Sequence, residues 1–336
     1  MTNFKFSILI PSYNGADVIG ETLKSILSQG YKNYEIIIND DKSTDATREV
    51  VKSFKDKRIR FFINKNNLGY PGNLNKCRQH AKGEIIYLMG QDDILAKDAL
   101  KNTNNAFNLS EDIGAVARPY RWFDKDNYDV TVRARKQINP KKDEVIPINS
   151  SYSKILGVFQ TLDSLSGLAY RVKFIDRSFH PDIFPCHVYP FASIWKKHPI
   201  VFLKDYTIGV RIESSQCRFL SSIYNKSPLL SWVQMFETIF KESKYSSLKN
   251  YCIKNFVAVN YVGLVQIRNY STYRNLLREI YYLIKYRKEN IISPKFWFFS
   301  IGTALTPTFI LIPMVDWFKK SVNSLRYKKI VFKYKL

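Results

Sequence analysis

Two pairs of adjacent aspartates stand out in the N-terminal third of the sequence, because each pair closes a short apolar run. Asp40 and Asp41 follow one such run, and a second pair, Asp92 and Asp93, follows another. Neighbouring carboxylates repel each other, so a pair costs stability unless something neutralises it. A divalent cation with a diphosphate would do so, because Mg²⁺ takes oxygen ligands from one or two carboxylates and from phosphate. The residues therefore indicate diphosphate chemistry.

Strand and helix patterns alternate through residues 4–118, and they decide where these acids lie. Apolar runs predict strands at about 6–10, 34–38, 59–63, 84–88 and 113–117. Helical spacing of apolar residues predicts helices at about 17–29, 45–54, 71–81 and 97–107. Such alternation is typical of a mostly parallel sheet flanked by helices.

Polar residues cluster where successive predicted strands end. In an open parallel sheet, ligands bind at the carboxyl ends of the strands, so these residues are the candidate site. The simpler alternative is that the acids are ordinary turn and helix-capping residues. The candidates are Pro11, Ser12, Tyr13 and Asn14 after the first strand, Asp40 and Asp41 after the second, Asn67 and Gly69 after the third, and Gln91, Asp92 and Asp93 after the fourth.

The composition is that of a folded protein from a reducing compartment. The chain has 336 residues, of which 45% are hydrophobic, so it can bury a full core. Its four cysteines are scattered without a CxxC pair, which argues against a disulfide scaffold and a structural zinc site. The apolar run near the N-terminus is too short for a signal peptide. We therefore expect at least the N-terminal end to be cytoplasmic.

Positive charge is concentrated at the C-terminal end of the chain. Residues 241–336 contain 18 Lys and Arg but only four Asp and Glu, a local net charge of +14 out of +23. A region of this kind binds polyanions, either nucleic acid or an anionic membrane surface.

The uncharged stretch 296–315 favours the membrane. Its 20 residues are long enough to cross a bilayer, and Trp297 and Trp317 lie near its ends. Pro307 and Pro313 disfavour a straight helix. The stretch could span the membrane, form a re-entrant hairpin or lie in the interface. The remaining alternative is a buried core helix followed by a solvated basic tail.

The N-terminal segments resemble the inverting glycosyltransferases of family 2, of the bacterial surface-polysaccharide type, which have the GT-A fold. The matching strings are SILIPSYNGADVIGETLKSILSQGYKNYEIIINDDKSTDAT and NNLGYPGNLNKCRQHAKGEIIYLMGQDDIL. They cover about residues 4–107, roughly a third of the chain. The resemblance implies a Rossmann-like, mostly parallel sheet flanked by helices, with a helical C-terminal extension.

The resemblance also divides the chain into functional regions. Residues 1–118 would be the nucleotide-sugar-binding half of the GT-A domain, and residues 119–235 the acceptor-binding half. Residues 236–336 would form a helical, basic, membrane-associated region. The protein would then sit at the cytoplasmic face of the plasma membrane as a peripheral or monotopic protein.

Roles for the nucleotide side follow from the resemblance. Ser12 and Tyr13 would lie against the nucleoside, between Pro11 and Asn14. Asp41 would accept a hydrogen bond from the base, which the family favours as uracil. A second group of nucleotide-binding positions would comprise Asp40 in support of Asp41, the Asn-x-Gly turn of Asn67 and Gly69, Asn75 on the next helix, and Gln91.

The metal would be Mg²⁺ or Mn²⁺, bound by Asp92 and Asp93, with Asp92 also on the nucleotide side. The family pattern is Asp-x-Asp-Asp, and here Gly90 replaces its first acid. Lys42 and Leu74 also depart from the residues usual in the family. These departures loosen the assignment of the diphosphate site.

The catalytic base is expected beyond the sheet, a few residues before a short helix. Alignment of that region places His187 at the family's acidic position, and Asp182 lies nearby. A histidine can serve, because its ordinary pKa is near neutral. The candidates are therefore His187, Asp182, or neither.

The expected function is transfer of a hexosyl or N-acetylhexosaminyl group from a nucleotide diphosphate sugar, with UDP favoured, to a saccharide acceptor. The acceptor would be lipid-linked, and the product a capsule or O-antigen. Two alternatives are a catalytically degenerate family member, suggested by Gly90, and a nucleic-acid-binding basic protein. A dinucleotide-binding oxidoreductase is disfavoured, because only Gly15 stands where a glycine-rich turn is required.

Overall fold

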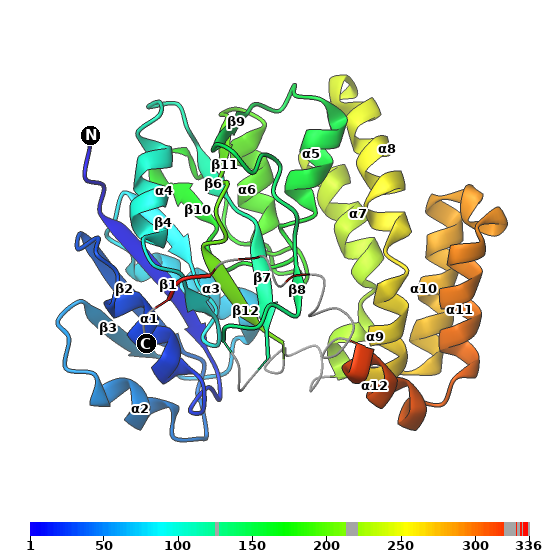
Figure 1. Ribbon diagram of the computed structural model, residues 1–336, viewed down its shortest axis with the longest axis horizontal. Helices are drawn as coiled ribbons and strands as arrows, with labels where there is room; N and C mark the ends of the chain where they lie inside the picture. Colours follow the sequence, from blue (N-terminus) through cyan, green and yellow to red (C-terminus); the bar gives the residue numbers. More distant parts are fainter. Residues whose placement is uncertain (125–127, 213–220, 319–326, 328–329, 331, 335–336) are drawn as a thin grey trace. The chain divides into compact units, whose positions relative to one another are not determined.

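The computed structural model describes residues 1–124, 128–212, 221–318, 327, 330 and 332–334 (Figure 1). The chain divides into two compact units. The larger contains residues 1–211 and 329–336, and the smaller contains residues 212–328. This division reflects compactness, so the predicted functional boundaries after residues 118 and 235 stay predictions.

A mostly parallel sheet is the centre of the larger unit (Figure 1). Strand β1 pairs in parallel with β2 and β4, and β2 pairs with β3, whereas β10 runs antiparallel to β4 and β6. Strands β1, β2 and β4 are almost wholly buried, as expected for a sheet covered on both faces. In sheet order, the eight described strands are β3 (Ile59–Ile63), β2 (Tyr34–Asp40), β1 (Phe6–Ser12), β4 (Ile85–Leu88), β10 (Ala169–Arg171), β6 (Ala115–Ala117), β11 (Ile200–Phe202) and β9 (Glu144–Ile146).

Helices between the strands cover this sheet. Helix α3 packs on β1 and β2, and both α4 and α6 contact β6. The predicted strands and helices of residues 4–118 are present, with ends that differ by a few residues. The helices are α1 (Ile19–Leu27), α2 (Thr47–Ser53), α3 (Gly69–His80), α4 (Ala99–Phe107), α5 (Tyr152–Phe159) and α6 (Val188–Trp195). The expectation of a mostly parallel sheet flanked by helices is confirmed.

A second, four-stranded sheet follows the order β5 (Ile94–Leu95), β12 (Ile208–Arg211), β7 (Tyr120–Phe123) and β8 (Arg133–Ala134). It brings together segments that are distant in the sequence, because β12 pairs with β5, more than 100 residues earlier, and with β7, 88 residues earlier. Strand β5 begins directly after Asp93. The small sheet therefore adjoins the second acidic pair.

The C-terminal residues return to this small sheet after the smaller unit. The ring of Phe332 is buried in a cluster with Ile94, Ala96 and Phe123. The guanidinium of the buried Arg121 lies 3.9 Å from the centre of that ring. Nearby, the backbone N–H of Lys97 donates to the carbonyl of Lys333 at 2.6 Å. The larger unit is therefore built from two separate stretches of chain.

The smaller unit is helical. Side chains of Ser227, Thr272 and Ser293 cap the N-termini of three helices by accepting backbone hydrogen bonds. Its helices are α7 (Pro228–Ile239), α8 (Ser246–Asn255), α9 (Val262–Tyr270), α10 (Tyr273–Tyr286), α11 (Pro294–Leu305) and α12 (Thr308–Trp317). The expected helical C-terminal extension is confirmed.

The uncharged stretch 296–315 is divided between two helices. Helix α11 ends at Leu305, and α12 begins after Pro307. Within the part of the chain that the structure describes, no helix is both long and apolar enough to cross a membrane. Cys217 and most of the basic positions after Phe318 lie outside the described residues.

We predict that Phe332→Ala lowers the free energy of unfolding of the larger unit by about 2–4 kcal/mol, because it empties a buried aromatic site and removes the ring beside Arg121. Urea unfolding followed by tryptophan fluorescence measures this change. Leu109→Ala is the control, because Leu109 is 57% exposed; its effect should stay within about 0.5 kcal/mol. Equal effects of the two substitutions would contradict the placement of Phe332.

Candidate active site

Polar groups from three strand ends meet at one edge of the main sheet. The parallel register of β1 and β2 places Ser12 opposite Asp40. The backbone N–H of Asp41 donates to the Ser12 carbonyl at 2.8 Å. The Ser12 hydroxyl donates to Oε1 of Gln91 at 2.7 Å, which connects the end of β4. The structure thus brings the predicted residues of the first, second and fourth strands together.

The carboxylate of Asp41 is buried and held in a fixed plane. Its Oδ1 accepts from Nδ2 of Asn64 and from the backbone N–H of Leu68, both at 2.8 Å. The amide of Asn73 supports this arrangement, because its Oδ1 accepts from Asn64 at 3.2 Å and its Nδ2 donates to the Ser12 carbonyl at 3.1 Å. Asn64 and Asn73 were not among the predicted site residues.

Asp40 serves the turn that follows it. The Asp40 carboxylate is fully buried and accepts from the backbone N–H of Ser43 at 3.1 Å and from the Ser43 hydroxyl. The neighbouring loop is tied to the same turn, because Oδ1 of Asn14 accepts from the N–H of Thr44 at 2.9 Å. Both Asn14 and Lys42 have positive φ, at 46° and 65°. Asp40 and Asn14 therefore shape the loops beside Asp41.

Gln91 fixes the backbone of Tyr13. Its Nε2 donates to the Tyr13 carbonyl and its Oε1 accepts from the Tyr13 N–H, both at 3.0 Å. This amide fits only because position 15 is glycine, since a Cβ on Gly15 would collide with Oε1 of Gln91. Pro11, within β1, leads into this loop. Gln91 therefore positions Tyr13, and its amide is occupied in doing so.

Asp93 is the most buried acid of the second pair. Its Oδ2 accepts from the hydroxyl of Ser166 at 2.5 Å, and its Oδ1 accepts from the backbone N–H of Arg211 at 3.0 Å. Burial, with the neighbouring charge of Asp92, raises the pKa of Asp93. Asp92 is less buried, at an intermediate level. The pair therefore combines one anchored and one more accessible carboxyl group.

Two arginines stabilise the surroundings of this pair. The fully buried guanidinium of Arg118 donates to the carbonyls of Thr161, Ser164 and Ser166, which fixes the loop that carries the Ser166 hydroxyl. Nε of Arg211 donates to the Asp92 carbonyl at 3.2 Å.

The same Arg211 guanidinium forms an ion pair with Glu21 of α1. Arg211 therefore ties the turn that carries the acidic pair to both β12 and α1. Ser166, Arg118 and Arg211 were all missed by sequence reasoning.

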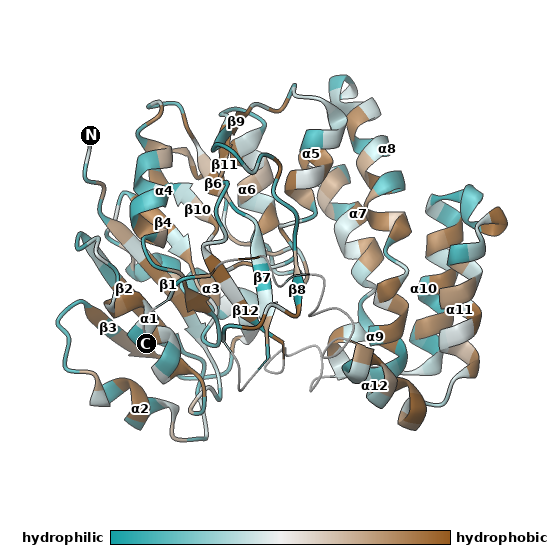
Figure 2. Ribbon diagram, viewed as in Figure 1, coloured by the Kyte–Doolittle hydropathy of each residue, from teal (hydrophilic) through white to brown (hydrophobic). Residues whose placement is uncertain are grey.

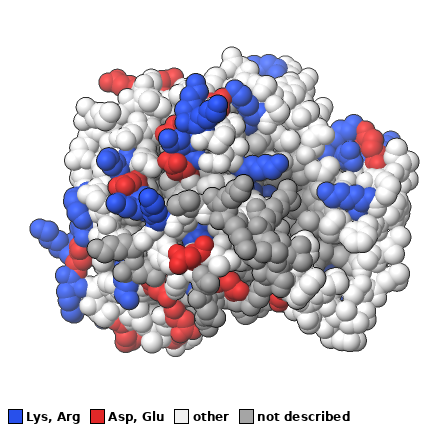
Figure 3. Space-filling model, in the orientation of Figure 1, with Lys and Arg blue, Asp and Glu red and all other residues white. Residues whose placement is uncertain are grey.

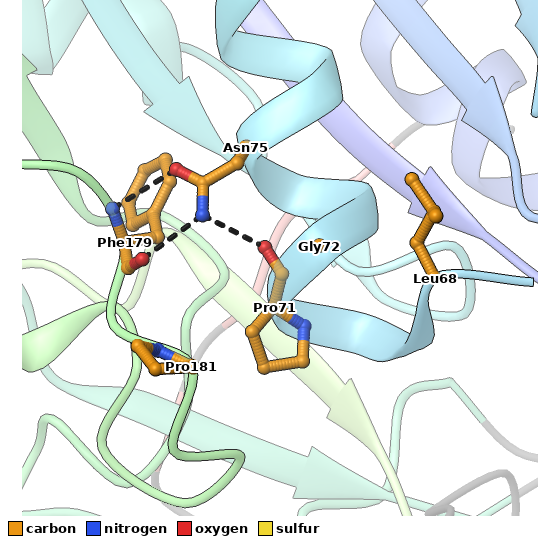
Figure 4. A pocket seen from close by; sticks show the side chains of 6 residues that line it. All are labelled: Leu68, Pro71, Gly72, Asn75, Phe179 and Pro181. Atoms are coloured by element: carbon orange, nitrogen blue, oxygen red, sulfur yellow. Dashed lines mark hydrogen bonds between the residues drawn. The ribbon is translucent and has the colours of Figure 1, made fainter.

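Leu68, the middle residue of the Asn-x-Gly turn, and Asn75 line a hollow beside α3 (Figure 4). Oδ1 of Asn67 accepts from the N–H of Gly69, whose φ is 71°. The Asn75 amide exchanges two hydrogen bonds with the backbone of Phe179, at 2.9 and 3.0 Å. A pocket of about 240 Å³ is lined by Leu68, Pro71, Gly72, Asn75, Phe179 and Pro181. The Asn75 side chain is thus used to hold the Phe179 segment against α3.

The two candidate bases are both buried. His187, at the N-terminus of α6, contacts the Leu162 carbonyl through Nε2 at 2.9 Å and the Tyr70 hydroxyl through Nδ1 at 3.3 Å. Burial lowers the pKa of His187 to about 4, so the ring is neutral at pH 7. Oδ1 of Asp182 accepts from the N–H of Phe184 at 3.2 Å.

The donor set suits a hard cation that also binds phosphate. Among the described residues there is no group of three or more His, Cys, Asp and Glu side chains that could hold a metal ion. Asp92 and Asp93 nevertheless supply two carboxylates, and Mg²⁺ needs only one or two together with phosphate oxygens. Gly90 leaves the space beside them free, because a Cβ there would lie 2.9 Å from Asp92 Oδ1 and 3.1 Å from Asp93 Oδ2. The residues present therefore fit Mg²⁺ or Mn²⁺ bound together with a diphosphate.

A parallel sheet with polar groups at its carboxyl edge defines an α/β protein built to bind a ligand there. The sequence profile of Glycosyl transferase family 2 matches residues 7–180, about half of the chain. The chain therefore belongs to this family.

Two relatives with assigned activities each match less than a third of the chain. The GalNAc(5)-diNAcBac-PP-undecaprenol beta-1,3-glucosyltransferase of Campylobacter jejuni is 37% identical over 99 residues, which are 29% of this chain and 32% of that protein. The UDP-Glc:alpha-D-GlcNAc-diphosphoundecaprenol beta-1,3-glucosyltransferase WfgD of Escherichia coli is 36% identical over 101 residues, 30% of this chain and 40% of that protein. The match therefore spans well under half the length of either relative.

Longer similarities extend over most of the chain. An uncharacterised glycosyltransferase of Haemophilus influenzae is 26% identical over 265 residues, 78% of this chain and 97% of its own. The crystal structure of S. aureus TarS 1–349 in complex with UDP-GlcNAc superposes with a TM-score of 0.61 at 16% identity, covering 93% of this chain and 91% of that one.

A mannosyltransferase of Pyrobaculum calidifontis, solved with GDP-Man and Mn²⁺, gives a TM-score of 0.56 at 15% identity, covering 96% and 89%. These likenesses confirm the expected GT-A fold.

We predict that Gly90→Ala destabilises the protein by about 1–3 kcal/mol, because the added methyl group would press on both carboxylates. Thermal or urea unfolding measures the change. Gly302→Ala is the matched control, since a Cβ there meets nothing within 4 Å and lies inside a helix. That control should leave stability unchanged or raise it by up to about 1 kcal/mol. Destabilisation by both would show that space beside the acids is not the cause.

We predict that the stability of the protein falls by about 2–3 kcal/mol between pH 7 and 4.5 through His187 alone. Its folded pKa of about 4 lies below the ordinary 6.5. Between pH 4 and pH 6.5 the unfolded chain binds a proton at His187 that the folded chain does not bind. The contribution of His187 to the free energy of unfolding is therefore complete above pH 6.5 and is lost as the pH falls towards 4. Urea unfolding across this range should show a shallower loss for His187→Gln. If the free energy of unfolding fell equally with pH in the unchanged protein and in His187→Gln, the burial of a neutral His187 ring would be contradicted.

Proposed function

We propose that this chain transfers a hexosyl or N-acetylhexosaminyl group from a UDP-sugar to a lipid-linked saccharide, with inversion, during synthesis of a surface polysaccharide. Membership of glycosyl transferase family 2 supports the reaction class. The observation that carries the proposal for this chain is that Asp41 and the Asp92–Asp93 pair follow β2 and β4, the two strands that flank β1, at the same edge of the main sheet.

On the nucleoside side, Asp41 would accept a hydrogen bond from N3–H of uracil. Its carboxylate is suited to this, because Asn64 and the Leu68 N–H already fix its plane through one oxygen. Tyr13, whose backbone is clamped by Gln91, would offer its ring to the nucleoside, with Ser12 beside it. Preorganisation of this kind limits the ordering cost of binding.

On the diphosphate side, Asp92 and Asp93 would hold Mg²⁺ or Mn²⁺. When bound, the ion would supply Lewis-acid stabilisation of the charge that develops on the departing nucleoside diphosphate. The protein's own contribution is positional: Ser166 and the Arg211 N–H hold Asp93 from both sides. Asp92 would present its more accessible carboxylate to the ligand.

A single in-line displacement requires a base that takes the proton of the acceptor hydroxyl. We retain His187 and Asp182 as the candidates. Nε2 of His187 faces the Leu162 carbonyl and therefore carries the ring proton, so Nδ1 would be the basic nitrogen and would have to exchange the Tyr70 hydroxyl for the acceptor hydroxyl. The variants His187→Gln and Asp182→Asn separate the candidates, because only loss of the base should reduce turnover at saturating donor and acceptor.

The acceptor and the location are proposed from the relatives. Two of them, in Campylobacter jejuni and Escherichia coli, are named for transfer to undecaprenol-diphosphate-linked saccharides. A lipid-linked acceptor would place this chain at the cytoplasmic face of the plasma membrane. The basic region 241–336 agrees with such a surface, because anionic lipids attract it.

A second candidate function is nucleotide-sugar binding without transfer. Gly90 motivates it, because the family's first acid is missing at that position. The geometry favours transfer, since Gly90 leaves room beside both remaining carboxylates. Turnover of a donor in the presence of metal would exclude this alternative.

We predict that Asp93→Asn lowers release of nucleoside diphosphate from the donor on the order of 100-fold, in a screen of UDP-, GDP- and dTDP-sugars with and without Mn²⁺. The fold should survive, because the substitution removes a buried charge that Asp92 already disfavours. Asp112→Asn is the matched control, since Asp112 pairs with His198 and lies before the start of β6, away from the carboxyl ends of the strands. Equal turnover of Asp93→Asn and Asp112→Asn, with Mn²⁺ present, would refute the assigned role.

A further inference from the structure

A concentrated apolar surface lies on the last two described helices of the smaller unit. Among the described residues, 23 large hydrophobic side chains are exposed, and eleven of them fall between positions 291 and 318. We call these eleven the apolar face. They are Ile291, Ile292, Trp297, Phe298, Ile301, Leu305, Phe309, Ile310, Met314, Trp317 and Phe318. Such a concentration exceeds the scattered exposure normal for a soluble surface.

The spacing within α11 shows that this face is an organised stripe. Phe298, Ile301 and Leu305 recur every three or four residues and are 74%, 50% and 76% exposed. The buried residues of the same helix, Phe296, Ser300 and Thr303, lie on its other side. Both α11 and α12 pack against α9, so the helices are anchored while the stripe stays uncovered. Figure 2 shows hydrophobic residues in brown along both helices.

The middle of the apolar face is uncharged, and charged residues lie near both of its ends. No charged residue occurs between Lys295 and Asp316. Lys288 and Lys295 are exposed on either side of Ile291 and Ile292, with the exposed Glu289 beside them. At the other end of the face, Asp316 precedes Trp317, and Lys319 and Lys320 follow in the sequence. In Figure 3 the surface over α11 and α12 is mostly white, with blue atoms and a smaller number of red atoms near the connection between α10 and α11. An uncharged centre whose flanking lysines outnumber its flanking acids is complementary to an anionic lipid surface.

The shape of the segment suits the membrane interface. At 1.5 Å per residue, α11 and α12 are each about 15–18 Å long, and Pro307 separates them. Two short helices with an exposed stripe can lie in the interfacial plane with bulky side chains in the acyl region. Trp297 and Trp317 are both exposed, and tryptophan prefers the headgroup level.

We infer that the apolar face of α11 and α12 docks this protein in the interface of an anionic bilayer, with Lys288 and Lys295 contacting lipid phosphates. The exposed side chains and the charges beside them support this inference. It rests on the proposed function only in its purpose, which is to bring the chain to a lipid-linked acceptor. Of the spanning, re-entrant and interfacial arrangements that the sequence left open, the inference selects the interfacial one and names the residues that would contact the lipid.

Sedimentation of the full chain with vesicles tests this inference. The vesicles are phosphatidylcholine alone, or phosphatidylcholine with an equal amount of phosphatidylglycerol, at low and high salt. We expect binding to the anionic vesicles that weakens with salt. Phe298→Glu combined with Leu305→Glu should lower the partition coefficient at least about tenfold. Lys288→Glu combined with Lys295→Glu should lower it about fivefold per residue on anionic vesicles only.

The matched control is Leu109→Glu combined with Val145→Glu, which adds the same charge at exposed hydrophobic positions of the larger unit. Its binding should equal that of the unchanged protein. Circular dichroism checks that all variants remain folded, as expected for side chains that are already exposed. Vesicle binding that the α11 substitutions leave unchanged, or that never occurs, would overturn the inference.

A second copy of the chain is the competing occupant, and sedimentation velocity reports on it. A dimer that the α11 substitutions convert to a monomer, without vesicle binding, would also overturn the inference. Release of nucleoside diphosphate in solution separates this test from the proposed function. Vesicle binding without turnover of any donor would support the docking surface and refute the proposed transfer. Turnover without vesicle binding would support the transfer and refute the docking surface.

Discussion

The buried carboxylate of Asp93 beside Asp92 is the constraint around which the larger unit is arranged. A charge in that position is unfavourable unless fixed donors replace the lost water. Ser166 and the Arg211 N–H supply those donors from opposite directions. Each donor must itself be held, which explains the buried guanidinium of Arg118 on the Ser166 loop. One acidic pair thereby determines where the main sheet, a distant loop and the small sheet meet.

The residues proposed for the donor side were predictable from the sequence because the information that locates them is local. Strands, helices and the polar residues that end them lie within residues 4–107, so periodicity and the family strings locate Asp41 and Asp93 together. Ser166 and Arg211 were not predictable, because they reach Asp93 across 73 and 118 residues of sequence. Neither belongs to a short pattern, and a lone serine or arginine carries no local signal. Only the pairing of β12 with β5 brings the Arg211 N–H to the acid.

Burial is the property that the sequence conveyed least. A histidine at the start of α6 has the right chemistry for a base, yet His187 is 3% exposed and both its ring nitrogens have contacts. The opposite holds for the uncharged stretch 296–315, whose composition suits a core as well as a membrane. Its Phe298 and Leu305 are instead among the most exposed hydrophobic side chains described. In both cases the sequence gives the residue type, but only the packing shows whether the side chain is buried or exposed.

The return of Phe332 to the small sheet has a consequence for how the protein is made. The larger unit needs both residues 1–211 and the C-terminal segment, and the whole of 212–328 is synthesised between them. At about 5–20 residues per second, the ribosome takes roughly ten seconds to supply that interval. Throughout it, the cluster of Ile94 and Phe123 lacks the ring of Phe332, and the Arg121 guanidinium lacks the ring that lies 3.9 Å from it in the complete structure. The helical unit can therefore fold before the unit that precedes it is complete, which reverses the usual order of synthesis and folding.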